Sequence, residues 1–476
     1  MEKVVRFILS NFPHQPTAGQ LSACEAMVQF LYDPDPAAAF VLKGYAGTGK
    51  TSLVSALVQS APALRIKTML LAPTGRAAKV LAGYSAQPAY TIHKKIYQTV
   101  TDSSGNIHMA RALNKHSYTL FIVDEASMIG LGDDGGYARR NLLEDLIDYV
   151  AEGNHCRLML IGDTAQLPPV GADQSPALDL EYLRAFSHLK IHHYELTEVV
   201  RQQHLSDILL NATLLRVKIS TLADGDFPEM PLFDLSEGGD VQRLGGAELE
   251  ETLNSEYDEA GIEQVVVVTR SNKRANLFNQ EIRNRVLFRE EEVNAGDYLM
   301  VVKNNYYWLD PESDIGFIAN GDIVEVQSLR NHQELYGFHF VDATLRFVDY
   351  PDAPVQDCKL LLETLHSESP SLTSDESQRL FETVMEDYAD MPRHADRLRA
   401  VKENPYYNAL QVKFAYALTC HKTQGGQWPT VIIDQGYVTD DMVDKEYLRW
   451  LYTAVTRATR RVYLLNFQDK FFDPAG

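Results

Sequence analysis

The sequence predicts an α/β fold with two parallel sheets in tandem, the second interrupted by a small β-barrel. Short apolar runs that end in Gly, Thr, Asp or Ser alternate with helix-like stretches through the first 200 residues. The alternation returns at residues 264–286 and again after residue 414. Between these parts, residues 293–350 contain short runs typical of an antiparallel barrel or meander. Continuous apolar strands separated by helices indicate a parallel sheet that is covered on both faces.

The first unit takes four strands from its apolar runs at residues 37–44, 68–75, 120–127 and 157–163. Each run is apolar nearly throughout and short, as a buried parallel strand should be. Because the carboxyl ends of parallel strands meet at one edge of a sheet, we expect the polar residues that follow these runs to lie close together.

The second unit begins with the apolar run at 264–270 and resumes at 414–428, 431–434 and 460–467. Residues 351–405 are polar and acidic and predict a loop followed by an amphipathic helix. The expected division is therefore a first domain at 1–203, with an insertion at 98–117. The second domain is built from 204–310 and 411–476, and an inserted barrel with an acidic helical segment occupies 311–410.

Composition sets limits on the partners and the compartment. The chain of 476 residues has 65 acidic and 44 basic side chains, a net charge of -21, which argues against binding nucleic acid through overall positive charge. A local basic groove depends on distribution and stays open. No apolar run is long enough to span a bilayer and the start has no signal-peptide pattern, so we expect a cytoplasmic protein. Neither a zinc site nor a disulfide framework is indicated by the four widely spaced cysteines, Cys24, Cys156, Cys358 and Cys420.

A phosphate-binding loop follows the first apolar run. Residues 44–51, GYAGTGKT, match the pattern G-x-x-x-x-G-K-[ST]. Glycines let backbone N–H groups surround phosphate oxygens, and the following helix points its positive end at them. A chance match is the alternative, and the preceding strand argues against it. We expect ATP with Mg²⁺, bound by Gly44, Ala46, Gly47, Thr48, Gly49, Lys50, Thr51 and Ser52.

Two further strand ends carry candidate catalytic groups. Asp124 and Glu125 end the third apolar run, where Asp124 would bind Mg²⁺ with Thr51 and Glu125 would polarise the attacking water. The alternative is that such carboxylates only cap the next helix. Gln166 lies in GDTAQ after the fourth run and could report on the γ-phosphate, although the segment alone is a plain turn.

Two arginines, Arg201 and Arg457, are candidates for reaching the γ-phosphate across a cleft. Arg201 lies near the join of the two units and Arg457 lies late in the second. Arginines in such positions stabilise the charge of a phosphoryl-transfer transition state. A lone arginine is more often part of a surface salt bridge, so both roles depend on the whole set of motifs.

That set resembles the superfamily-one helicases, in particular the RecD-like and Dda-like branch. The resemblance covers nearly the whole chain, and its segments occur in the family's order. They are PTAGQLSA (16–23), GYAGTGKT, APTGRAAKVL (72–81), TIHKKIY (91–97), FIVDEASM, IGDTAQLPPVG, ELTEVVRQ, MVVKNN with ANGDIVEV, TCHKTQGGQW (419–428) and YTAVTRATR (452–460). It implies two RecA-like domains and an SH3-like barrel.

The resemblance also implies residue roles. Gln20 would read adenine, and Gln427 stands where the family often has a glutamate for the ribose. Val200 replaces the aromatic residue that often precedes the family's arginine, here Arg201, so nucleotide preference stays open. Residues 98–117 would carry a pin that splits duplex, folded as a hairpin around Ser104-Gly105, with a plain loop as the alternative. The expected DNA contacts are Pro73, Thr74, Arg76, Thr91, His93, Asn304, His421, Lys422, Thr423 and Gln424.

The sequence therefore predicts an ATP-dependent DNA helicase and translocase that moves 5′ to 3′ on single strands. Its expected partners are single-stranded DNA, duplex junctions and a protein loader or recombination partner, and we expect a monomer. Three alternatives stay open: a RecD-like non-motor scaffold of a recombination or nuclease complex, a motor that acts on RNA, and a small-molecule kinase. A small-molecule kinase would not need the HKTQG segment or the two distant arginines.

Overall fold

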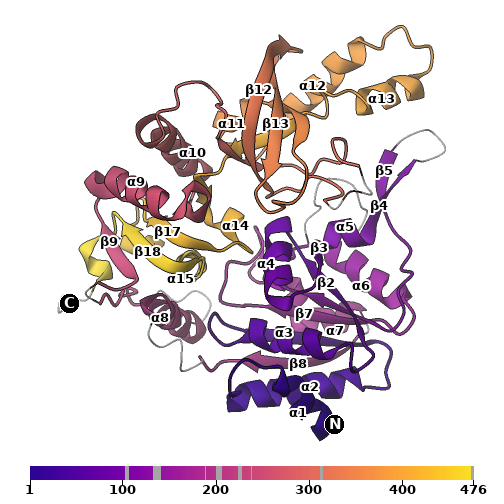
Figure 1. Ribbon diagram of the computed structural model, residues 1–476, viewed down its shortest axis with the longest axis vertical. Coiled ribbons are helices and arrows are strands. Elements are labelled where there is room, and N and C mark those ends of the chain that lie inside the picture. Colours follow the sequence, from indigo (N-terminus) through magenta and orange to yellow (C-terminus); the bar gives the residue numbers. More distant parts are fainter. Residues whose placement is uncertain are drawn as a thin grey trace.

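The computed structural model contains two parallel sheets and a closed barrel, which confirms the predicted fold class (Figure 1). It describes residues 1–101, 107–131, 141–187, 189–199, 206–222, 228–236, 238–310, 313 and 315–472. We call the part from the amino terminus to residue 199 lobe 1. The second parallel sheet with its helices is lobe 2, and the barrel is inserted into lobe 2.

The sheet of lobe 1 has six strands in the order β3-β2-β6-β7-β1-β8, and all neighbouring pairs are parallel. Alternate residues of β1 face opposite sides: Phe40 and Leu42 pack with α1, α2 and α3, whereas Ala39 and Val41 pack with α6. The strands are β1 (Ala38–Gly44), β2 (Lys67–Ala72), β3 (Ala89–Thr91), β6 (Thr119–Val123), β7 (Arg157–Gly162) and β8 (Lys190–Leu196). The helices are α1 (Glu2–Ser10), α2 (Ala18–Leu31), α3 (Lys50–Ser60), α4 (Gly75–Ser85), α5 (Ile92–Ile96), α6 (Leu142–Glu152) and α7 (Leu180–Ser187).

Two strands extend from lobe 1 between α5 and β6. β4 (Tyr97–Thr101) and β5 (Ile107–Arg111) pair antiparallel, so residues 98–101 and 107–111 of segment 98–117 form a pair of strands rather than a plain loop. The hydroxyl of Tyr97 donates to Asp145 of α6 at 2.7 Å, and Arg111 bonds Glu152 of α6 at 2.7 Å. These contacts fix the base of the pair on lobe 1. Ser104 and Gly105, where we expected the turn, lie outside the described residues.

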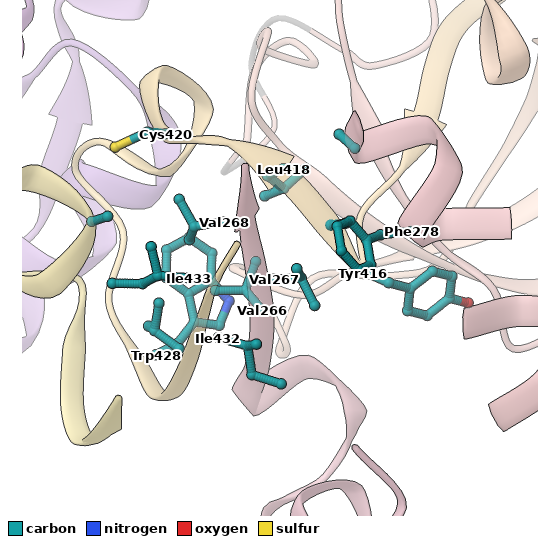
Figure 2. Packing of buried hydrophobic residues seen from close by; sticks show 14 of the residues in the cluster. Val266, Val267, Val268, Phe278, Tyr416, Leu418, Cys420, Trp428, Ile432 and Ile433 are labelled. Carbon is teal, nitrogen blue, oxygen red and sulfur yellow. The ribbon is translucent and has the colours of Figure 1, made fainter. Parts of the chain in front are cut away.

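The sheet of lobe 2 has five parallel strands in the order β16-β10-β17-β18-β9. Figure 2 shows its core, where Val268 of β10 lies on the same face of the sheet as Ile433 of β17 and Val267 lies on the same face as Ile432. The strands are β9 (Val241–Leu244), β10 (Val265–Thr269), β16 (Ala417–Thr419), β17 (Trp428–Asp434) and β18 (Ala458–Leu465). The helices are α8 (Asp207–Thr221), α9 (Leu249–Ala260), α10 (Asn272–Glu281), α14 (Cys420–Thr423) and α15 (Lys445–Val455).

The barrel closes through five strands, of which sequence reasoning missed two, the fourth and the fifth along the chain. β14 (Gln356–Leu361) lies in the polar stretch 351–405, where we expected a loop and a helix but no strand. β11 (Tyr298–Val301) and β15 (Leu410–Phe414) close the barrel against each other and lie outside the segment 311–410 expected for the insertion. The other strands are β12 (Ile323–Leu335) and β13 (Phe338–Phe347), and the barrel is accompanied by α11 (Glu363–His366), α12 (Ser374–Glu386) and α13 (His394–Lys402).

The barrel lies against lobe 1 at the helix α4 that follows β2. Lys79 of α4 donates to the carbonyl of Val348 at 3.1 Å and lies 3.8 Å from a carboxylate oxygen of Asp349. Gly75, the first residue of α4, faces Asp322 at the start of β12, where a Cβ would lie 2.5 Å from Oδ1. The barrel therefore covers the amino-terminal end of a segment that the sequence assigned to DNA contact.

None of the helices among the described residues is both long and apolar enough to cross a bilayer. Within the same residues, no three or more His, Cys, Asp or Glu side chains gather into a group that could bind a metal ion.

Candidate functional site

The phosphate loop joins β1 to α3 at the carboxyl edge of the lobe 1 sheet. Gly47 and Gly49 have φ of +75° and +82°, a region that disfavours side chains, so these two glycines permit the loop's path. The Thr48 hydroxyl donates to Tyr45 O at 2.8 Å, and Lys50 Nζ donates to Gly44 O at 2.6 Å. Helix α3 begins at Lys50, so its amino-terminal N–H groups lie at this loop, which suits an anion.

The acidic strand end lies two strands away in the same sheet. The Asp124 carboxylate accepts the Glu125 N–H at 2.9 Å and also accepts the hydroxyl of Tyr84 from α4. Burial raises the pKa of Tyr84, and Asp124 adds to the rise, so the phenol stays protonated and donates. Glu125 has φ of +52°, which turns its side chain out of the strand direction. Sequence reasoning missed Tyr84, for which helix α4 gave no signal.

Arg457 of lobe 2 faces Glu125 of lobe 1. Arg457 Nη1 lies 3.9 Å from Glu125 Oε1, and the arginine side chain is only 5% exposed. The remaining guanidinium contacts are within lobe 2, where Nε donates to Thr453 O at 3.1 Å. Burial raises the pKa of Glu125 and Arg457 opposes the rise, while Asp124 raises the pKa and Lys50 lowers it. The expected proximity of Arg457 to the acidic strand end is therefore present.

The loop after β7, residues 162–167, is held by lobe 2. Leu167 packs its side chain into the lobe 2 core, its N–H donates to Thr453 Oγ1 at 2.8 Å, and its carbonyl accepts Gln424 Nε2 at 2.6 Å. Gln166 is buried in the same loop, and its Oε1 has no hydrogen-bond partner among the described residues. A buried amide oxygen without a partner is costly, so this side chain is available to a polar group in the cleft.

Gln20 connects helix α2 to the phosphate loop. It is 1% exposed, and its Nε2 donates to Thr48 O at 2.9 Å. Its Oε1 accepts the Thr17 N–H at 2.9 Å, which completes the capping box of α2. The structure thus gives Gln20 a role in supporting the loop, next to the adenine-reading role that the resemblance implies.

The DNA-contact candidates of lobe 1 lie at two helix starts. Thr74 and Thr91 cap α4 and α5 by accepting the N–H groups of Ala77 and Lys94 at 3.2 and 3.1 Å. Thr91 is only 6% exposed and the barrel covers the start of α4, so both threonines hold helix starts, and their contact with strand phosphates stays a prediction. Pro73 and His93 are half-buried beside them.

Arg76 reaches lobe 2 rather than solvent. Its guanidinium lies 3.7 Å from the Trp428 ring centroid, and Nη2 donates to Gln427 O at 3.3 Å. Gln427 itself is exposed. Arg76 therefore joins the α4 segment to the strand that follows the TCHKTQGG segment.

Two of the DNA-contact candidates of lobe 2 are corrected by their burial. Thr423 is fully buried and its hydroxyl donates to Cys420 O at 2.7 Å, so it braces α14 and is closed to a strand. Gln424 is 7% exposed and its amide is bonded to Leu167 O across the lobes, which makes it a link between lobes. A shared motif does not separate residues that touch DNA from residues that join domains.

The other lobe 2 candidates are accessible. His421 and Lys422 are half-buried, and Lys422 Nζ donates to Asn320 Oδ1 in the barrel at 2.8 Å. Asn320 N–H in turn donates to Asn304 Oδ1 at 2.7 Å. Burial lowers the pKa of His421, which favours a neutral ring. Arg201 and Val200 lie outside the described residues.

Two family matches coincide with these sites. Residues 15–219 match the family described as an AAA domain, and residues 414–465 match the family described as a UvrD-like helicase C-terminal domain. The first match includes the phosphate loop and Glu125. The second includes Arg457 and the TCHKTQGG segment.

Similar proteins include two curated relatives. The chain is 26% identical to the ATP-dependent RecD2 DNA helicase of Deinococcus radiodurans, covering 89% of this chain and 46% of the relative. It is 22% identical to an uncharacterised protein of Acanthamoeba polyphaga mimivirus, covering 89% of this chain and 94% of that protein. The chain thus spans nearly the whole viral relative and less than half of the bacterial one.

Solved structures of Pif1 helicases are also similar. One, described as forked-duplex unwinding by two coordinating Pif1 helicases, has a TM-score of 0.49 and 16% identity over 97% of this chain and 95% of that chain. The Bacteroides Pif1 helicase with ADP-AlF3 and single-stranded DNA has a TM-score of 0.47 and 15% identity over 94% of both chains. With TM-scores below 0.5, these structures carry no argument about the family or the function of the chain. The two matched families and the RecD2 relative support the resemblance of the ordered motifs to superfamily-one helicases of the RecD-like type.

Proposed function

We propose that the protein is an ATP-dependent DNA helicase that translocates 5′ to 3′ on single-stranded DNA and unwinds duplex in DNA repair, recombination or replication. One observation carries the proposal: Arg457 of lobe 2 lies 3.9 Å from Glu125 of lobe 1, at the edge where the phosphate loop ends. A triphosphate bound by Lys50 in lobe 1 would then meet an arginine of lobe 2. Hydrolysis would remove a charge that both lobes hold and would change how they pack.

The residues of lobe 1 fit a magnesium nucleotide. The Thr51 hydroxyl is exposed at the first turn of α3, and the Asp124 carboxylate ends β6. Both are oxygen donors of the kind that Mg²⁺ prefers, and Asp124 is held in place by Tyr84 and the Glu125 N–H. In this proposal they hold the ion, which would neutralise phosphate charge, while Lys50 and the loop amides hold the nucleotide.

The proposed catalytic roles follow from burial and charge. Glu125 polarises water from the carboxyl end of β6, where its carboxylate faces Arg457. Gln166 accepts a hydrogen bond from the attacking water through Oε1, which has no partner in the described chain. Arg457, with Arg201, stabilises the transition-state charge.

In the proposed path, DNA crosses the carboxyl edges of both sheets. Pro73, Thr74 and His93, which are half-buried, would lie along the strand in lobe 1, and His421, Lys422 and Asn304 lie on the lobe 2 and barrel side. The β4–β5 strand pair lies at the edge of lobe 1 and is the candidate pin. We further propose a cytoplasmic monomer that works with a loader or a recombination partner.

An unwinding assay on duplexes with either a 5′ or a 3′ single-stranded tail tests this function. The proposal predicts ATP-dependent unwinding of the duplex with the 5′ tail and little of the other. Unwinding only with a 3′ tail would overturn the polarity. Absence of both unwinding and DNA-stimulated ATP hydrolysis would favour the scaffold alternative, and equal stimulation by a matched RNA would favour an RNA motor.

A further inference from the structure

The hydroxyl of Tyr452 is a polar group of lobe 2 that bonds a backbone amide of the phosphate loop. Tyr452 lies on α15 and is 1% exposed. Its oxygen accepts the N–H of Ala46 at 2.8 Å, and its proton is donated to Asp163 Oδ2 at 2.5 Å. Asp163 follows β7, and its Oδ1 accepts the N–H of Ala165 at 2.9 Å. One phenol therefore links the loop after β1, the loop after β7 and a helix of lobe 2.

The protonation state of Tyr452 is fixed by its surroundings. Burial raises the pKa of Tyr452 well above its ordinary value, and the neighbouring Asp163 adds to the rise. The neutral hydroxyl has one proton to donate, and Asp163 takes it. Its oxygen is then available to accept from Ala46, so the direction of both hydrogen bonds is determined.

Helix α15 transmits the position of this hydroxyl to the arginine. The next residue, Thr453, accepts the Leu167 N–H at 2.8 Å. The carbonyl of Thr453 accepts Arg457 Nε at 3.1 Å. A shift of the Ala46 amide therefore acts on the same turn of helix that holds Arg457 against Glu125. The packed helix carries such a shift as a rigid element.

We propose that Tyr452 is a positioning residue that couples the phosphate loop to Arg457. The inference rests on the proposed ATP hydrolysis and deepens it. When the loop amides turn toward a nucleotide, the hydrogen bond from Ala46 to Tyr452 changes. Helix α15 then moves Arg457 to the position beside Glu125 from which it stabilises the transition state. Tyr452 itself touches no phosphate and acts through Arg457.

Steady-state ATP hydrolysis with saturating single-stranded DNA gives the first test. Tyr452→Phe keeps the buried ring and removes only the hydroxyl. Its kcat should fall at least about tenfold while its KM for ATP stays within about threefold, because the groups that bind ATP are untouched. Tyr447→Phe is the matched control, because it also removes a buried hydroxyl from α15. That hydroxyl accepts a hydrogen bond from Gln435 at 3.4 Å. The kcat of Tyr447→Phe should stay within about twofold of the wild type.

A double variant separates positioning from a general loosening of the helix. If Tyr452 acts through Arg457, the combination of Tyr452→Phe with Arg457→Ala should be no slower than Arg457→Ala alone. The inference is overturned if Tyr452→Phe keeps wild-type kcat, if Tyr447→Phe loses as much, or if the two defects multiply. Thermal melting of each variant shows that it is folded.

A readout without hydrolysis distinguishes this inference from the proposed function. The described cysteines, Cys24, Cys156, Cys358 and Cys420, are buried, so dyes can be placed at Leu113→Cys in lobe 1 and Tyr437→Cys in lobe 2, whose wild-type side chains are exposed. A non-hydrolysable ATP analogue should change the energy transfer between the dyes, and Tyr452→Phe should at least halve that change. An unaltered change in Tyr452→Phe overturns the inference even if the wild type hydrolyses no ATP.

Discussion

The carboxyl group of Asp322 should make the stability of the protein fall as pH rises, and Asp322→Asn should remove that effect. Asp322 is 2% exposed at the contact of the barrel with α4. Its Oδ2 accepts the Ala319 N–H at 2.7 Å, whereas Oδ1 has no hydrogen-bond partner among the described residues. Burial raises the pKa of Asp322 from 3.8 to about 7, with the Ala319 N–H opposing and Asp349 adding to the rise.

The magnitude follows from that rise. The folded state binds the proton more tightly than the unfolded chain, so stability is lost between pH 4 and pH 7 and is level above pH 7. At 1.36 kcal/mol per pKa unit the whole loss is about 4 kcal/mol, of which about 3 kcal/mol falls above pH 5. The advantage of Asp322→Asn over the wild type should therefore be about 3 kcal/mol larger at pH 8 than at pH 5.

Urea unfolding at pH 5 and pH 8, followed by circular dichroism, measures this difference. Asparagine can still accept from Ala319, so the turn that begins β12 should survive. The matched control is Asp352→Asn, an exposed acid of the same barrel, which should have a small effect at both pH values. An Asp322→Asn advantage that is the same at pH 5 and pH 8, or a wild type that gains stability over this range, would refute the reasoning.

Three other substitutions test the nucleotide site and the contact between lobes. Lys50→Ala should abolish DNA-stimulated ATP hydrolysis with an unchanged melting temperature; normal hydrolysis would refute the loop assignment. Glu125→Gln should lower kcat by about 10² to 10⁴-fold and retain nucleotide binding in a fluorescent-nucleotide titration; a comparable loss of binding would contradict its role toward water. Gly425→Ala should lower the unfolding free energy by about 1–3 kcal/mol, because Gly425 has φ of +73° and a Cβ would lie 2.7 Å from Ala77 Cβ; unchanged urea unfolding would show that the lobes do not hold this contact.

The parts of the site that could be predicted are local in sequence. The phosphate loop, Asp124 with Glu125, and Thr74 each follow a recognisable apolar strand, and parallel strands bring such ends to one edge. For the segment that forms β4 and β5 the sequence predicts either a hairpin or a plain loop. Ser104-Gly105 is a turn signal that favours the hairpin, but the flanking residues are polar.

The remaining features depend on contacts between distant parts of the chain. Tyr452 and Ala46 are 406 residues apart, and Gln424 and Leu167 are 257 apart. No local pattern reports such pairs, so Gln424 and Thr423 were placed with the DNA contacts that their motif usually supplies. Strand β14 was hidden by Lys359, which is buried because its ammonium pairs with Asp342 of β13 at 2.5 Å. Without that partner a lysine in the middle of a strand predicts a solvent-facing position.

The Arg457→Ala variant tests most directly whether residues of both lobes contact one bound triphosphate. Nucleotide affinity and single-turnover hydrolysis should be measured on the same preparation with saturating single-stranded DNA. Because Lys50 and the loop amides remain, we expect binding within a few-fold of the wild type and hydrolysis slower by about 10³-fold or more. Hydrolysis by Arg457→Ala at the wild-type rate would mean that lobe 1 acts alone and would contradict the account.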